Sequence, residues 1–249
     1  MDLKSDIIGL RTMFVFSARK LLLHKRWLLA VALGLLVCAV MGYGASQEDA
    51  DIGTASDMMD MLLLTFLLPV MALIYGASMI RNEMDDRSII QVITSPLDRR
   101  ISYLGYYAAL TVVLIALMLV ITALGGTTFF IIDGAGGALE LMLPFMYAIC
   151  IGAAAYSALF LVLGVVFKQP IYLGLFYVFI WEGFVGYQDG AIAQYTIRHQ
   201  LQVIVSNMVE SGNISSVEGD AGMATIVLVV LTVVLLVLGA YAFREKEVP

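Results

Sequence analysis

One acidic residue, Glu182, lies inside an otherwise uncharged apolar stretch and is the first candidate for chemistry in this chain. A charge within a hydrocarbon layer is costly, so this side chain should face protein or water, or be protonated. It follows Pro170 by about 12 residues, which is about 18 Å along a helix. This distance places Glu182 in the outer half of a membrane. Two interpretations stay open: Glu182 lines a path or gate, or it ties its helix to the following loop.

Residues that commonly carry catalysis or bind metals are few. The two histidines, His24 and His199, lie outside the apolar stretches, and no Gly-x-Ser-x-Gly nucleophile motif occurs. Cys38 and Cys150 fall within apolar runs, where free cysteine behaves as a small hydrophobic residue. The methionines of segment 57–61 could supply thioethers to Cu(I), but no cysteine or histidine joins them. We therefore expect neither catalytic residues nor a metal site.

The composition predicts an all-α membrane protein. Of 249 residues, 61% are hydrophobic and 14% are charged, whereas soluble domains have about 45–50% and about 25%. An ordinary cytosolic enzyme is thereby excluded, and the net charge of −6 argues against a nucleic-acid partner. Solid apolar runs of about 20 residues indicate membrane-crossing helices rather than barrel strands. We predict six transmembrane helices in a single domain, 1–249: 27–44, 61–80, 101–124, 141–167, 171–187 and 222–243.

The third run continues beyond residue 124, and we place its end there because Gly125-Gly126 could terminate a helix. Orientation follows from the basic residues, since Lys and Arg favour cytoplasmic loops. With six spans, Arg198 alone lies on one side of the membrane. The other side carries Lys4, Arg11, Arg19, Lys20, Lys25, Arg26, Arg81, Arg87, Arg99, Arg100, Lys168, Arg244 and Lys246. Both termini are therefore predicted to be cytoplasmic.

Three segments outside the predicted spans have helical patterns. Residues 1–26 combine an apolar face with a basic one, which is typical of an amphipathic helix in the membrane interface, contacting lipid headgroups. The outer loop 188–221 repeats apolar residues at helical spacing and should contain a short helix. Between spans two and three, segment 81–100 should form a short amphipathic cytoplasmic helix that ends before Pro96. Its branched apolar residues need headgroups or a partner protein to bury against.

This last segment resembles the ABC-2 type permeases, the membrane subunits of ATP-driven transporters, in particular prokaryotic members. Their pattern is a glutamate, Gly-Thr, an apolar run, then proline, a small residue and arginine. Arg87-Ser88 stands in place of Gly-Thr. The matching residues here are Glu83, Ile89, Ile90, Ile93, Pro96 and Arg99. Trp181-Glu182 and Tyr195-Thr-Ile-Arg-His199 add to the similarity.

The resemblance implies that the segment is a coupling helix that docks on a separate ABC ATPase subunit, with Glu83, Arg87 and the three isoleucines at the contact. It also implies two permease copies, as a homodimer or heterodimer, and export of a substrate. The sequence contains no Gly-x-x-x-x-Gly-Lys-Ser/Thr phosphate loop. ATP would therefore be bound by the partner, and the chain needs no cofactor of its own. The alternative is an ion-coupled carrier or channel that works without an ATPase.

Overall fold

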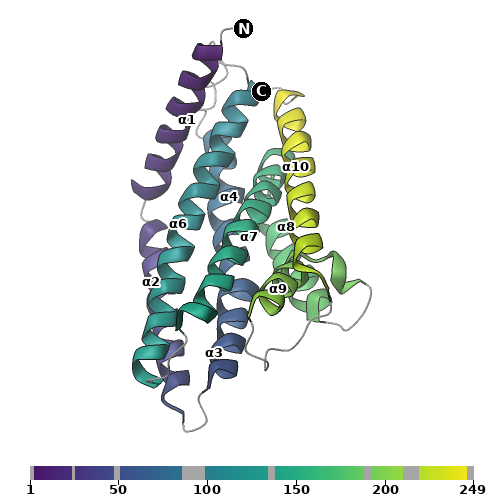
Figure 1. Cartoon of the computed structure of the whole chain (residues 1–249). Coiled ribbons are helices and arrows are strands. Elements are labelled where there is room, and N and C mark those ends of the chain that lie inside the picture. The colour runs from purple at the N-terminus through teal and green to yellow at the C-terminus, as the bar shows by residue number, and fades with distance from the viewer. Residues whose placement is uncertain are drawn as a thin grey trace.

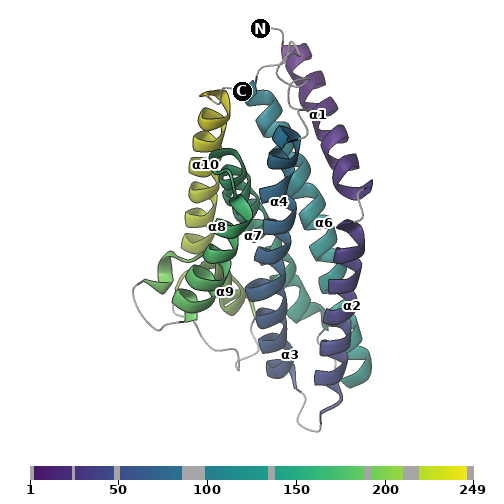
Figure 2. The ribbon, with the colours of Figure 1, turned by 180° about the vertical axis from the view of Figure 1, so that it is seen from behind.

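The computed structural model describes residues 3–23, 26–47, 51–85, 99–133, 138–187, 192–209 and 219–245. Within these ranges every regular element is a helix, and the long helices lie side by side in one bundle (Figure 1, Figure 2). The elements are α1 (Leu3–Leu23), α2 (Arg26–Ala45), α3 (Ile52–Met59), η1 (Asp60–Leu67), α4 (Leu68–Asp85), α6 (Arg99–Asp133), α7 (Ala138–Val166), α8 (Pro170–Phe176), η2 (Tyr177–Phe184), η3 (Val185–Tyr187), η4 (Ala193–Tyr195), α9 (Ile197–Met208) and α10 (Ala221–Glu245).

Within the described part of the chain, five helices are long and apolar enough to cross a membrane. They are Trp27–Ala45, Ile52–Ala77, Arg100–Asp133, Leu139–Val166 and Ala221–Glu245. The chain is therefore a multi-pass membrane protein, since its composition excludes a soluble bundle of this kind. The predicted span 171–187 corresponds to α8, η2 and η3, whose apolar part, Pro170–Phe184, is shorter than the other five. The count of six spans stays a prediction.

The predicted helix end near residue 124 is wrong. Helix α6 continues without a break through the glycine pair to Asp133. A Cβ added to Gly125 would lie 2.7 Å from Val37, and one added to Gly126 would lie 3.0 Å from Met142 and Met59. The two glycines therefore serve close packing against α2, α3 and α7 rather than helix termination, as small residues do in membrane helix interfaces.

Helices also extend beyond the predicted second span. Elements α3, η1 and α4 follow one another without interruption from Ile52 to Asp85, against the predicted 61–80. The start is fixed by Asp51, whose carboxylate accepts a hydrogen bond of 2.7 Å from the backbone N–H of Thr54. An N-terminal cap of this kind satisfies a backbone donor that has no partner in the helix. The hydropathy pattern alone predicted a start at residue 61, which is nine residues after the observed start at Ile52.

Residues 3–23 form the helix α1, but it packs lengthwise along the first half of α6 (Figure 1). The contact is close, since a Cβ on Gly105 would lie 2.8 Å from the Cβ of Met13. Met13 and Leu21 are buried, whereas Val15 and Phe16 are each 54% exposed. The apolar face is therefore divided between α6 and the surroundings. The position in the membrane interface stays a prediction.

Helix α7 lies at the centre of the bundle and contacts α4, α6, α9 and α10. It approaches α4 closely at Gly164, where an added Cβ would lie 3.0 Å from the carbonyl oxygen of Ala77. A backbone atom cannot move aside as a flexible side chain can. The close packing of these two helices therefore requires glycine at this position.

We expect Gly164→Leu to destabilise the fold by about 1–3 kcal/mol, because overpacking forces the two backbones apart. The measurement is thermal unfolding of the purified protein in detergent. Gly222→Leu is the matched control, because Gly222 is exposed and an added Cβ meets only the carboxyl of Asp220. Both changes raise helix propensity equally. Equal melting temperatures for the two variants would contradict the assigned contact.

The start of α1, the end of α4, the start of α6 and the end of α10 lie at the same end of the bundle (Figure 1, Figure 2). The ring of Tyr103, near the start of α6, lies 5.9 Å from that of Phe243, near the end of α10. This end carries Arg100 and Arg244, which the charge rule places on the cytoplasmic side. We refer to it below as the basic end.

Candidate functional site

A polar junction joins three helical segments on the side of the bundle away from the basic end. We define it as Asp60 of η1, Tyr177 and Glu182 of η2, and the N-terminal part of α9 with Thr196, Arg198 and Gln202. Among the described residues, Glu182 and Arg198 are the buried charged side chains, with 1% and 5% exposure. Buried charges need partners, so their contacts define what this site does.

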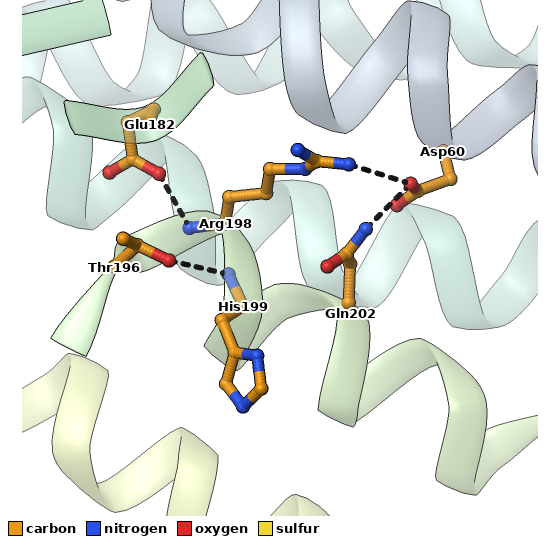
Figure 3. A network of polar contacts seen from close by, with 6 residues as sticks. All are labelled: Asp60, Glu182, Thr196, Arg198, His199 and Gln202. Carbon is orange, nitrogen blue, oxygen red and sulfur yellow. Dashed lines mark hydrogen bonds and ion pairs between the residues drawn. The ribbon is translucent and has the colours of Figure 1, made fainter. Parts of the chain in front are cut away.

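Glu182 binds the N-terminus of α9. One carboxylate oxygen, Oε1, accepts hydrogen bonds from the Tyr177 hydroxyl (2.6 Å) and from the backbone N–H of Ile197 (3.2 Å). The other, Oε2, accepts one from the backbone N–H of Arg198 (3.0 Å), as Figure 3 shows. The first N–H groups of a helix lack partners within it and carry partial positive charge. The carboxyl oxygens of Glu182 satisfy two of them.

Thr196 completes this helix start. Its backbone is extended, and its hydroxyl accepts a hydrogen bond of 3.2 Å from the backbone N–H of His199 (Figure 3). Threonine is a favourable N-cap because its oxygen replaces the missing intrahelical acceptor. The first three N–H groups of α9 are therefore satisfied by two side chains, one local and one from η2. Burial lowers the pKa of His199, so its neutral form dominates at neutral pH.

Arg198 and Gln202 connect α9 to the second span. One guanidinium nitrogen of Arg198 lies 3.8 Å from Oδ2 of Asp60, and the amide of Gln202 donates a 2.7 Å hydrogen bond to the same oxygen. Arg198 and Gln202 are four residues apart, so they share one face of α9 (Figure 3). In this ion pair the side chain of Arg198 is buried, whereas that of Asp60 is 25% exposed.

Both acids lie in π-helical segments, Asp60 at the start of η1 and Glu182 within η2. A π-helix is wider than an α-helix and changes the direction of the side chains that follow. In η2 the buried residues are Val178 and Glu182, while Phe179, Ile180, Trp181 and Phe184 are exposed. Glu182 therefore lies on the one buried face of η2, whose other side chains are mostly exposed.

The contacts of the junction hold helices together. They are hydrogen bonds from backbone N–H groups to side chains, two hydrogen bonds between side chains and one ion pair. Among the residues that the structure describes, no three His, Cys, Asp or Glu side chains form a group that could hold a metal ion. The contacts of Glu182 are those that the tether interpretation requires. Its role on a substrate path stays a hypothesis.

The structure describes the backbone of only two of the predicted coupling residues, Glu83 and Arg99. Arg87, Ile89, Ile90, Ile93 and Pro96 lie outside the described residues. Glu83 falls in the last turns of α4, and Arg99 begins α6. The end of α4 and the start of α6, which flank the intervening segment in the sequence, both lie at the basic end (Figure 1).

Sequence reasoning missed Asp60, Arg198 and Gln202 as site residues. Arg198 had a signal, because it is the one basic residue that the charge rule leaves on the outer side. Asp60 and Gln202 are 142 residues apart, and nothing in either local sequence indicates their pairing. The acid in the neighbouring span is Glu182, so this signal would have pointed to the wrong partner, because the structure pairs the guanidinium of Arg198 with Asp60.

These features define the class of protein: a multi-pass helical membrane protein with buried polar contacts between its helices. Comparison with known families gives the narrower assignment. The family described as ABC-2 family transporter protein matches residues 14–248, which is nearly the whole chain. The chain therefore belongs to the ABC-2 transporter family and is a membrane transport permease. No curated protein matches it.

Proposed function

We propose that this protein is the membrane subunit of an ATP-driven ABC-2 exporter and that a separate ATPase subunit drives it. The observation that carries the proposal is the family match over residues 14–248. The arrangement of the helices supports it, because the start of α1, the end of α4, the start of α6 and the end of α10 lie together at the basic end (Figure 1, Figure 2). In this proposal segment 86–98, which follows α4 and precedes α6 in the sequence, meets the cytoplasmic ATPase.

A separate energy source follows from the sequence. The chain has no phosphate-loop motif, so ATP binding by that route must come from another polypeptide. In this proposal the isoleucines at 89, 90 and 93 bury against the ATPase, and Glu83, Arg87 and Arg99 flank the contact. The assembly contains two permeases and two ATPases. It resides in the cell membrane with six spans and with both termini in the cytoplasm.

The other function to test is an ion-coupled carrier or channel. A carrier of this kind needs an intramembrane acid that is able to exchange its ion or proton. Glu182 accepts three hydrogen bonds, two of them from backbone groups at a helix start. These contacts favour a fixed carboxylate, so the structure gives the ATP-driven function more support.

The test is purification of the tagged full-length chain from native membranes, followed by reconstitution into vesicles. We expect ATP hydrolysis that vanadate inhibits, together with a second polypeptide whose peptides contain a phosphate-loop sequence. Hydrolysis should rise when the complex is reconstituted relative to the isolated ATPase. Vesicles that transport at the full rate with the permease alone would overturn the proposal in favour of the ion-coupled function.

A further inference from the structure

The hydrogen bond between Tyr177 and Glu182 depends on the π-helical form of η2. The two residues are five positions apart, and the Tyr177 hydroxyl donates to Oε1 of Glu182 over 2.6 Å. In an α-helix, side chains five positions apart point about 140° away from each other around the axis. In the π register each backbone N–H bonds the carbonyl five positions earlier, so residues 177 and 182 lie on one face. The contact therefore exists only while η2 keeps the π register.

The end of η2 combines two hydrogen-bond registers. The backbone N–H of Val185 is shared between the carbonyl oxygens of Ile180 and Trp181, which are five and four positions earlier. The first bond has the π register and the second has the α register. At the end of η1, by comparison, the N–H of Leu68 bonds the carbonyl of Leu63 in the π register. The wide turn of η2 is therefore the one that already lies partway toward an α-helix.

The residues before Glu182 are fixed by packing on α7. A Cβ added to Gly174 of α8 would lie 3.3 Å from the ring of Phe160, and the ring of Tyr177 lies 6.2 Å from that of Phe160. The end of η2 is less constrained, since the side chain of Phe184 is 65% exposed. A change of register in η2 would therefore leave α8 in place and rotate Glu182.

Helix α9 is also held in place by contacts other than those of Glu182. It packs against α7, α10 and η1. Its Leu201 would lie 2.7 Å from a Cβ on Gly152 of α7. Its Gln202 donates a hydrogen bond of 2.7 Å to Asp60 of η1 (Figure 3). Glu182 adds the hydrogen bonds from η2 to the first backbone N–H groups of α9. Rotation of Glu182 would therefore separate η2 from α9 while α9 keeps its place on α7.

We propose that η2 is a conformational switch that attaches the end of its helix to α9 in the π register and releases it in the α register. A shift to the α register rotates Glu182 by about 100°, the rotation of one residue, away from the start of α9. Single π turns within α-helices are frequent at functional sites. The N–H groups of Ile197 and Arg198 would then bind water, as the first N–H groups of many helices do. The switch lies within this one chain and goes beyond ATP-driven transport, so it holds or fails independently of the ATPase.

The first test removes one residue from the wide turn. Deletion of Ile180, which is 47% exposed, leaves Tyr177 and Glu182 four positions apart. Side chains at that spacing share one face of an α-helix. An α-helical segment then keeps the hydrogen bond that the wild type makes only in the π register. We expect this variant to fold and, in detergent, to unfold at a temperature no lower than that of the wild type.

Deletion of Val230 is the matched control, because this residue is 55% exposed and lies within the α-helix α10. Here the deletion rotates the rest of α10 by about 100°. Gly239 would then no longer face Tyr103, which packs so closely on it that an added Cβ would overlap the ring. We expect the unfolding temperature of the control to fall well below that of the wild type. A variant without Ile180 that unfolds as early as the control, or does not fold, would overturn the proposal.

The second test measures the distance between η2 and α9 in the full-length protein, with Cys38 and Cys150 replaced by alanine. Spin labels are attached at Phe184→Cys and Met208→Cys, two exposed positions on η2 and α9. Labels at Met208→Cys and Val233→Cys, on α9 and α10, form the reference pair. The distances are measured by double electron–electron resonance in nanodiscs of dioleoyl phosphatidylcholine.

We expect two distances between residues 184 and 208 and one distance between residues 208 and 233. Deletion of Ile180 should leave one of the two 184–208 distances, which is then that of the attached form. Tyr177→Phe should raise the ratio of the released form to the attached form about tenfold, which corresponds to about 1.4 kcal/mol for one lost hydrogen bond. Glu182→Ala should show the distance of the released form alone.

A single 184–208 distance that Tyr177→Phe and Glu182→Ala leave unchanged would contradict the switch, because η2 would then hold one register. Selection of the same distance by the deletion of Ile180 and by Glu182→Ala would contradict it as well. A change in the 208–233 distance in these variants would show that α9 itself moves, which also contradicts the proposal.

Discussion

Simultaneous replacement of Ile89, Ile90 and Ile93 by aspartate is expected to abolish the stimulation of ATP hydrolysis by the permease. Each buried isoleucine contributes about 1.5–3 kcal/mol, so removal of three should cost at least about 4 kcal/mol. That loss weakens binding of the ATPase by about a thousandfold. The measurement is ATP hydrolysis by the reconstituted complex, together with the amount of ATPase that copurifies.

The matched control places the same three charges at polar positions of the same segment, as Ser88→Asp, Gln91→Asp and Thr94→Asp. These changes should leave copurification of the ATPase close to wild type, because no apolar face is lost. Membrane insertion of both triple variants is verified first. If the isoleucine variant retains a fully coupled ATPase, the docking segment is elsewhere in the chain.

Glu182→Ala is expected to destabilise the outer side of the bundle more than any other single substitution at an acid. It leaves two backbone N–H groups of α9 and the hydroxyl of Tyr177 without their acceptor in a buried place. Each unsatisfied group costs about 1–3 kcal/mol. Thermal unfolding in detergent should show the loss, and proteolysis should become faster near α9. Glu140→Ala is the control, because Glu140 is an exposed acid in the first turn of α7.

Glu182→Gln separates the two interpretations of this residue. Glutamine retains one carbonyl oxygen as an acceptor but turns an NH₂ donor toward one of the backbone N–H groups. A tether should lose part of its stability and keep transport in proportion to the folded protein. Loss of transport with unchanged unfolding temperature and unchanged ATPase assembly would instead place Glu182 on the substrate path.

The class of protein could be predicted from the sequence because hydropathy is a local, additive property. Solid apolar runs predicted helices in a membrane, and the five long apolar helices agree with that prediction. The family resemblance rested on a short cytoplasmic pattern and agrees with the match over residues 14–248. Neither required knowledge of which helix packs on which.

Helix ends were less predictable, for an identifiable reason. The pair Gly125-Gly126 has the composition of a helix stop, yet α6 passes through it. Glycine permits both a turn and a close approach of another helix. Only the positions of Val37, Met59 and Met142 show that close approach is the operative property.

What the sequence by itself determined is the membrane class and the presence of an acid at residue 182 within an apolar stretch. What only the tertiary structure decided is the partners of that acid. The contacts of Glu182 with Arg198, and of Asp60 with Gln202, join residues that are 16 and 142 positions apart. Their meeting depends on where α9 packs against α7 and η1. That placement follows from the shape and volume of side chains across several helices, which no single stretch of sequence encodes.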